Sequence, residues 1–149
     1  MKLIHKIYGT GQPLIIMHGL FGSGDNWRSI ARMMEPHYQS IVVDMRNHGR
    51  SPHDPEMNFQ VMADDILELM TDLKLEKVSL LGHSMGGKVA MQFSLLYPAL
   101  VEKLIVVDIA PKYYPPHHDV VIEAIESIDP KQLTDRMEAE NAMARFLGN

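Results

Sequence analysis

A serine stands between two glycines in the stretch Gly82-His83-Ser84-Met85-Gly86, after an apolar run at residues 77–81 and before a helix-like run at residues 85–97. On a sharp strand-to-helix turn, side chains two positions before and after the serine would collide with each other and with the strand, and glycines remove them. Such a turn presents the serine hydroxyl at the end of the strand. This context favours Ser84 as a catalytic nucleophile over the alternative, a chance match in an ordinary turn.

Two backbone N–H groups are candidates to bind the negatively charged oxygen that attack by a serine creates. Met85 begins the expected helix, where unpaired N–H groups and the helix dipole favour an anion. Leu20 lies in the loop at residues 18–23, which follows an apolar strand at residues 13–17 and whose glycines let the backbone approach a ligand. We therefore predict an oxyanion hole formed by the N–H groups of Leu20 and Met85.

The same loop and the serine turn supply the substrate-binding candidates, which are His18, Gly19, Phe21 and His83. Phe21 is expected to line a pocket for an acyl group, with packing in the core as its alternative. His18 is expected above all to support its own loop. The alternation of side chains near a strand end is expected to turn His83 away from Ser84.

Four motifs resemble, in their order along the chain, one subgroup of the α/β-hydrolases, the small bacterial YbfF-like esterases related to the abhydrolase-domain-11 proteins. The resemblance runs from about Leu3 to the C-terminus. The motifs are His18-Gly-Leu-Phe-Gly-Ser23, Asp44-Met-Arg-Asn-His-Gly-Arg-Ser51, Gly82-His-Ser-Met-Gly-Gly-Lys88 and Val107-Asp-Ile-Ala-Pro111. The resemblance implies hydrolysis of an ester or thioester by a serine nucleophile, a histidine base and an acid, with no metal and no cofactor.

Asp108 is the candidate acid, because it ends an apolar strand at the sheet edge where Ser84 is expected. A carboxylate there would orient a histidine and stabilise its protonated form. The match to the Asp-Ile-Ala-Pro motif supports this role, although many α/β-hydrolases carry the acid one strand later, in a segment absent here. Asp44, at another strand end, is expected to hold the loop at residues 46–51 by hydrogen bonds and ion pairs. His48 on that loop is expected to be exposed.

The histidine base is the missing member of the triad. In this fold the order along the chain is serine, acid, histidine, and only His117 and His118 follow Asp108. Both stand at the entry to a segment that the resemblance identifies as a lid, whereas the family's histidine follows the final strand. We therefore expect this chain to be the N-terminal part of a longer hydrolase. Alone it should be nearly inactive, because losing the base of such a triad costs on the order of 10⁶ in kcat in subtilisin, a published example.

Short apolar strands alternate with amphipathic helices along the chain. Strands are expected near residues 2–8, 13–17, 40–44, 77–81 and 104–107, the first two antiparallel, and helices near residues 27–34, 59–73 and 85–97. Asp25 or Ser23 can cap the first helix, and the second should open near Asn58. The alternation predicts an α/β fold with a mostly parallel, doubly wound sheet, truncated after the strand that ends at Asp108. The ligand site then lies at the carboxyl ends of the strands.

Two parts are predicted in the domain organisation, a hydrolase core at residues 1–116 and an incomplete helical lid at residues 117–149. Helices are expected at residues 119–127 and after Asp129-Pro130, since an aspartate followed by proline is typical of a helix start. Simple packing of these helices on the sheet is the alternative to a lid. The strand at residues 104–107 would present an open apolar edge, which favours pairing with a C-terminal fragment, self-association or poor solubility.

The composition restricts the classes of binding partner and the cellular location that we expect. A chain of 149 residues with 46% hydrophobic content can bury one core, and a net charge of −5 with both signs interspersed argues against nucleic acid. No run approaches the roughly 18 apolar residues of a membrane span. The first six residues lack the apolar core of a secretory signal, so a cytoplasmic location is expected. The absence of cysteine excludes disulfides and thiol catalysis.

Together these features predict a serine hydrolase that cleaves small carboxylic esters or acyl thioesters through an acyl-enzyme intermediate. Hydrolysis of a carbon–carbon bond on the same scaffold is one alternative. A pseudohydrolase that binds a ligand without catalysis is the other. Serine at position 84 argues against the haloalkane dehalogenases and epoxide hydrolases, which resemble this fold but carry aspartate there.

Overall fold

The structure, a computed structural model, describes residues 1–114, 119–129 and 135–147. The chain divides into two compact units, Met1–Pro111 and Lys112–Asn149. The first unit carries the serine turn. The boundary that the sequence predicts between residues 116 and 117 lies outside the described residues.

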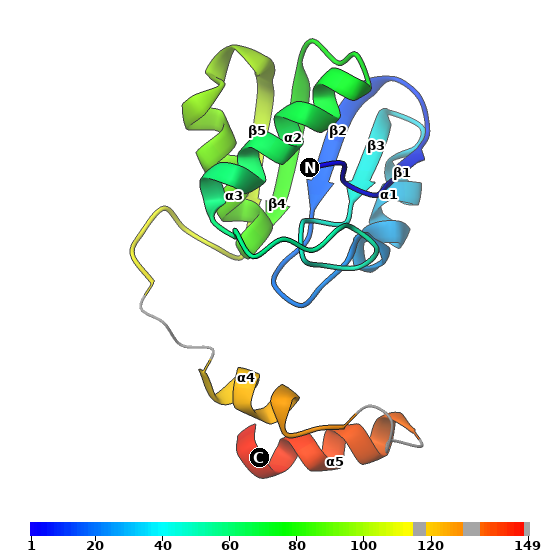
Figure 1. The fold of residues 1–149 in the computed structure, drawn as a ribbon. Coiled ribbons are helices and arrows are strands. Elements are labelled where there is room, and N and C mark those ends of the chain that lie inside the picture. Colours follow the sequence, from blue (N-terminus) through cyan, green and yellow to red (C-terminus); the bar gives the residue numbers. More distant parts are fainter. Residues whose placement is uncertain (115–118, 130–134, 148–149) are drawn as a thin grey trace. The chain divides into compact units, whose positions relative to one another are not determined.

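One five-stranded sheet forms the centre of the first unit, in the order β1-β3-β2-β4-β5 (Figure 1). Its strands are β1 (His5–Tyr8), β2 (Gln12–Met17), β3 (Tyr38–Val43), β4 (Val78–His83) and β5 (Val101–Val107). The last four strands are parallel, and β1 pairs antiparallel with β3. The first two strands therefore run in opposite directions, as expected, but β3 lies between them. The predicted mostly parallel sheet is confirmed.

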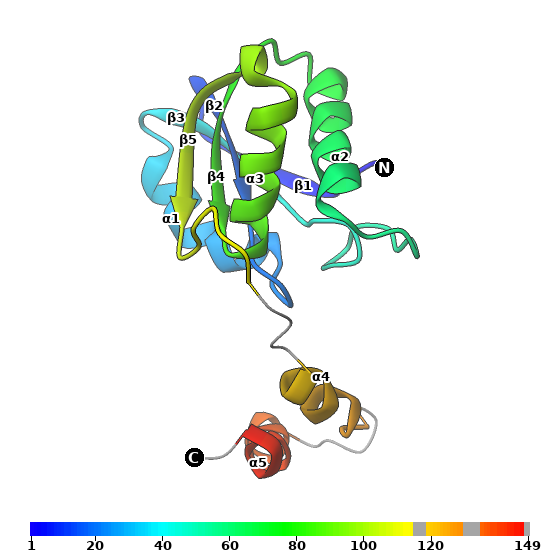
Figure 2. The ribbon, with the colours of Figure 1, turned by 90° about the vertical axis from the view of Figure 1, so that its left-hand side faces the viewer.

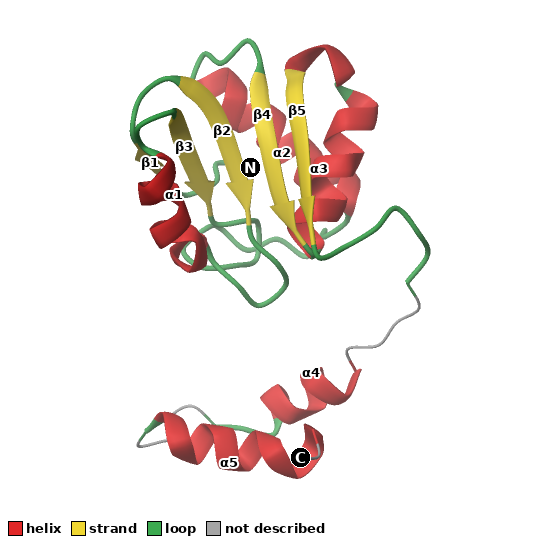
Figure 3. Cartoon of the chain, turned by 180° about the vertical axis from the view of Figure 1, so that it is seen from behind, coloured by secondary structure: helices red, strands yellow, loops and turns green. Residues whose placement is uncertain are grey.

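Helices cover both faces of this sheet, so the doubly wound arrangement is also confirmed. Figures 2 and 3 show α2 and α3 on one face and α1 on the other. The helical elements are η1 (Gly24–Trp27), α1 (Arg28–Met34), α2 (Phe59–Asp72), α3 (Met85–Leu96) and the short η2 (Pro98–Leu100). Asn58 caps α2 by accepting a hydrogen bond from the N–H of Val61 at 2.9 Å, where the sequence predicts the helix to open.

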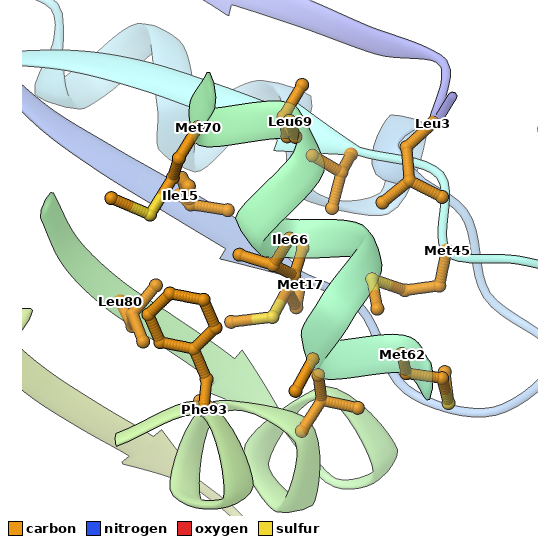
Figure 4. Close-up of a cluster of buried hydrophobic side chains, with 14 of the residues drawn as sticks. Leu3, Ile15, Met17, Met45, Met62, Ile66, Leu69, Met70, Leu80 and Phe93 are labelled. Carbon is orange, nitrogen blue, oxygen red and sulfur yellow. The ribbon is translucent and has the colours of Figure 1, made fainter. Parts of the chain in front are cut away.

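The larger part of the core lies between the sheet and the helices α2 and α3 (Figure 4). Ile15, Ile41 and Leu80 stand in register across β2, β3 and β4, and all three are fully buried. Five methionines join them in this cluster, namely Met17, Met45, Met62, Met70 and Met85. Flexible thioether side chains fill irregular gaps well, which accounts for part of the high methionine content.

Strand β5 forms one edge of the sheet and pairs, within the described residues, with β4 alone. Leu104 is 40% exposed and Ile105 is 41% exposed. The open apolar edge expected at this strand is therefore present in the described part of the chain.

The second unit contains two described helices, α4 (Asp119–Glu126) and α5 (Arg136–Leu147). They pack against each other, and Ala124 of α4 is fully buried. The helix predicted at residues 119–127 is confirmed, whereas the entry expected at Asp129-Pro130 extends outside the described residues. In the described ranges, no helix is both long and apolar enough to span a membrane.

Candidate active site

The serine turn joins β4 to α3, with Ser84 between the last residue of the strand and the first residue of the helix. Ser84 has φ 49° and ψ −111°, a strained conformation of the kind that clusters at functional sites. Its N–H donates to the carbonyl oxygen of Val107 at 3.0 Å, which fastens the turn to the end of β5. The expected sequence of strand, tight turn and helix is confirmed.

Close backbone packing explains both glycines of the motif. A Cβ atom at Gly82 would lie 2.2 Å from the carbonyl oxygen of Gly86, and one at Gly86 would lie 2.4 Å from that of Met17. Any side chain at either position would therefore push the helix away from the strands. The collisions expected from the sequence are present in the structure.

The Ser84 side chain is half-buried, and among the described residues its hydroxyl has no hydrogen-bond partner. Met85 is the first residue of α3, so its N–H has no acceptor within the helix. The next N–H, that of Gly86, donates to the carbonyl oxygen of His18 at 3.1 Å. This hydrogen bond holds the loop after β2 against the serine turn.

Gly19 brings that loop into direct contact with the turn. A Cβ atom at Gly19 would lie 2.9 Å from His83 Nδ1 and 3.4 Å from Ser84 Cβ. Leu20 follows directly and is half-buried. Of the two residues predicted to donate to an oxyanion, Met85 thus follows Ser84 directly, and Leu20 follows the glycine that contacts the serine turn.

His18 is 1% exposed and is the first residue of the loop at residues 18–23. Its Nδ1 donates to the carbonyl oxygen of Gly19 at 2.7 Å, and its Nε2 accepts from the N–H of Met45 at 3.0 Å. Burial lowers the pKa of His18, against the opposing effect of the Gly19 hydrogen bond. Both ring nitrogens are engaged by backbone groups, which agrees with a role in supporting the loop.

A hollow of about 630 Å³ opens beside the loop. It is lined by His18, Gly19, Leu20, Phe21, Gly22, Asn26, Trp27, Ile30 and His83. Phe21 is 55% exposed with φ 60°, so its alternative interpretation as a core residue is wrong. Sequence reasoning overlooked the contribution of Trp27 and Ile30, although their three-residue spacing places them on one face of a helix.

His83 lies in this hollow. Its ring packs against Trp27 with 6.1 Å between ring centroids, and its Nε2 lies 3.7 Å from Asp108 Oδ2. The side chain of His83, which alternation is expected to turn away from Ser84, lines the open hollow and is not part of the buried core.

Asp108 follows β5 directly, at φ 54° and with its side chain 84% exposed. Because Ser84 is hydrogen-bonded to the residue before Asp108, the carboxylate stands at the same edge of the sheet as the serine. The described residues hold no group of three or more metal-ligating side chains.

Asp44 organises the neighbouring loop through hydrogen bonds, as expected. Its carboxylate accepts from the N–H groups of Gly24 at 2.7 Å and Arg50 at 3.0 Å. The ion pairs expected for Asp44 are not formed among the described residues. The guanidinium of Arg50 pairs with Asp25 at 3.2 Å instead.

Arg46 of the same loop donates two hydrogen bonds to the buried carboxylate of Asp65, at 2.6 and 2.8 Å. This contact raises the pKa of Arg46. The loop between the two arginines folds inward, and His48 is therefore 8% exposed, so the expectation that it is exposed is wrong. Its ring lies 5.1 Å from that of His18, and its Nδ1 donates to the Arg46 carbonyl oxygen at 2.8 Å.

Known proteins resemble this chain both in sequence and in structure. A family model described as the alpha/beta hydrolase fold matches residues 12–140. The Escherichia coli protein named Esterase YbfF is 39% identical over 139 residues, covering 93% of this chain and 55% of that protein. The Danio rerio protein named sn-1-specific diacylglycerol lipase ABHD11 is 39% identical over 147 residues, covering 93% of this chain and 46% of that protein.

A solved structure titled Marine microorganism esterase superimposes with a TM-score of 0.93 at 45% identity. The superposition covers 99% of this chain and 59% of that one. The chain therefore spans about half the length of the curated relatives cited above.

Proposed function

The chain belongs to the α/β-hydrolase family, and from this membership we propose that it supplies the nucleophile of a serine hydrolase that cleaves carboxylic esters or acyl thioesters. The observation that carries the proposal is the conformation of Ser84, strained, half-buried and set between a strand end and a helix start. The names of the relatives, esterase and lipase, support an ester substrate.

In the proposed reaction the Ser84 oxygen attacks the acyl carbon while its proton passes to a histidine base. The N–H groups of Leu20 and Met85 bind the carbonyl oxygen as it becomes negative, and each such donor typically contributes about 10²–10³-fold in kcat. The protonated base then gives its proton to the departing alcohol or thiol. Water finally releases the acyl group from Ser84.

Asp108 is proposed to orient the base, which its position beside the serine turn supports. The exposed ring of Phe21 is proposed to contact the apolar part of the acyl group, together with His83 and the Gly19 backbone in the hollow.

We propose that the base itself comes from polypeptide beyond this chain. Ser84 has no hydrogen-bonded histidine among the described residues. Buried His18 has both ring nitrogens committed to the backbone, and His117 and His118 lie outside the described residues. The greater length of the relatives supports a histidine further along a longer polypeptide or on a second one.

A fluorophosphonate probe tests the nucleophile in the complete enzyme, which contains the histidine-bearing segment in the same or a second polypeptide. We expect labelling at Ser84 by peptide mass mapping. S84A should abolish labelling and lower the hydrolysis of a p-nitrophenyl ester by at least about 10⁴-fold. The matched control is S94A, because the Ser94 hydroxyl only donates to the Ala90 carbonyl oxygen within α3, at 2.8 Å.

An unlabelled Ser84 in an enzyme that still binds an acyl ester would favour the pseudohydrolase. Cleavage of a β-diketone without cleavage of esters would favour the carbon–carbon bond hydrolase. Rapid ester turnover by the 149-residue chain alone would contradict the proposed origin of the base.

A further inference from the structure

His18 connects three parts of the site through its ring and its carbonyl oxygen. The ring bridges the Gly19 carbonyl oxygen, at 2.7 Å from Nδ1, and the Met45 N–H, at 3.0 Å from Nε2. The carbonyl oxygen of His18 accepts from the N–H of Gly86 at 3.1 Å. A residue that is 1% exposed thus joins the loop after β2, the loop after β3 and the serine turn.

These contacts define one protonation state of the ring. A carbonyl oxygen can only accept a hydrogen bond and a backbone N–H can only donate one, so the hydrogen is on Nδ1 and Nε2 is bare. A hydrogen on Nε2 would face the Met45 N–H and leave the Gly19 oxygen without its ring donor.

The hydrogen bond from Nδ1 also sets the direction of the next N–H. In a planar trans peptide the C=O of Gly19 and the N–H of Leu20 point in opposite directions, and no peptide bond among the described residues is cis. The Gly19 oxygen is held by the His18 ring and by the N–H of Gly22 at 3.0 Å. The Leu20 N–H therefore points away from the buried ring, on a loop that packs against Ser84 at Gly19.

We propose that His18 is a positioning residue for the oxyanion hole, whose Nδ1–H fixes the Gly19–Leu20 peptide so that the Leu20 N–H faces the oxygen of a substrate bound to Ser84. This inference rests on the proposed function. Through its carbonyl oxygen His18 also holds the N–H of Gly86, next to the second donor, Met85.

Two substitutions separate the ring nitrogens. H18N places an amide donor near the position of Nδ1, whereas H18Q places an amide oxygen near Nε2 and removes the donor to Gly19. In the complete enzyme we expect H18Q to lower kcat by about 10- to 100-fold with KM changed by less than about threefold, since a misdirected donor costs somewhat less than a deleted one. H18N should remain within about threefold of the wild-type kcat.

The matched control is H48Q, which removes another buried ring donor, to the Arg46 carbonyl oxygen, without touching the Gly19 peptide. It should lower the Tm about as much as H18Q and leave kcat close to the wild-type value. Equal losses of kcat in H18N, H18Q and H48Q would show a general structural effect and overturn the proposal. A wild-type kcat in H18Q would overturn it as well.

The ring state is measured without turnover, by long-range ¹H–¹⁵N correlation spectra of the wild-type protein labelled at histidine. We expect a His18 ring protonated at Nδ1 and bare at Nε2 near neutral pH, and the opposite tautomer would refute the positioning role. The experiment distinguishes failure of this inference from failure of the proposed function. The wild-type enzyme would then neither label at Ser84 nor hydrolyse esters, even though the spectra show the expected tautomer.

Discussion

At the scale of single residues, the neutral ring of His18 links stability to pH. Desolvation lowers the pKa of His18, with smaller contributions from nearby His48, which lowers it, and Asp44, which raises it. In the unfolded chain a histidine titrates near pH 6.5. As the pH falls below about 6.5, the unfolded chain therefore takes up a proton that the folded ring resists, and the free energy of unfolding decreases.

We predict that urea unfolding shows this loss between about pH 7.5 and pH 5.5, and that H18N shows a shallower dependence because the titrating group is gone. Carboxylates whose pKa is lowered, such as that of Asp25, contribute at lower pH, near and below about pH 4. Equal slopes for H18N and the wild-type protein over the upper range would contradict the assignment.

Individual residues differ in how well the sequence predicts them. Gly82 and Gly86 are predictable because a backbone collision is a local property of a five-residue motif. The burial of His48 is not predictable in this way, since its loop is held by contacts with residues outside it, such as the hydrogen bond from the Arg50 N–H to Asp44 and the ion pair of Arg46 with Asp65. Contacts of this kind between a strand end and a loop leave no periodic signal in the sequence.

At the scale of elements, the start of α2 depends on one cap. The Asn58 side chain accepts from the N–H of Val61, one of the helix N–H groups that have no backbone acceptor. We predict that N58A lowers the free energy of unfolding by about 1 kcal/mol in urea titrations. The substitution N58D retains an acceptor oxygen and should be close to neutral, and equal losses in both variants would argue against capping.

The bounds of α2 and the turn before α3 follow from the sequence, because amphipathic spacing and glycine placement act within one element. Which strands are neighbours in the sheet does not follow from the sequence in this way. Strand β1 runs opposite to β2, as expected, yet it pairs with β3. Strand β3 also pairs with β2, and this parallel pairing requires a crossover connection between segments that are distant in sequence. The hollow lined by Trp27 and His83 depends on the same long-range arrangement, since it brings η1 and β4 together.

At the scale of the whole molecule, one edge of the sheet is open in the described part of the chain. Among the described residues β5 has a single neighbouring strand, and Leu104 and Ile105 are each about two-fifths exposed. Unpaired backbone groups beside exposed apolar side chains are a template for pairing with another chain. The relatives, about twice as long, have additional polypeptide that could occupy this edge.

We therefore predict that the 149-residue chain self-associates through β5, with an apparent mass that rises with concentration in sedimentation equilibrium. I105K should lower this association, because a lysine on an edge strand opposes pairing with a second strand. The matched control is L95K, since Leu95 is 79% exposed but lies on α3 and not on the edge strand β5.

If the apolar surface in general drove association, the two lysines would act alike, because each adds the same charge to an exposed aliphatic position. If the edge drives it, only I105K lowers the apparent mass, and a polypeptide that supplies the adjoining strand should lower it in the wild-type chain as well. A wild-type chain that stays monomeric at all concentrations would contradict the prediction that the β5 edge pairs with a second copy of this chain.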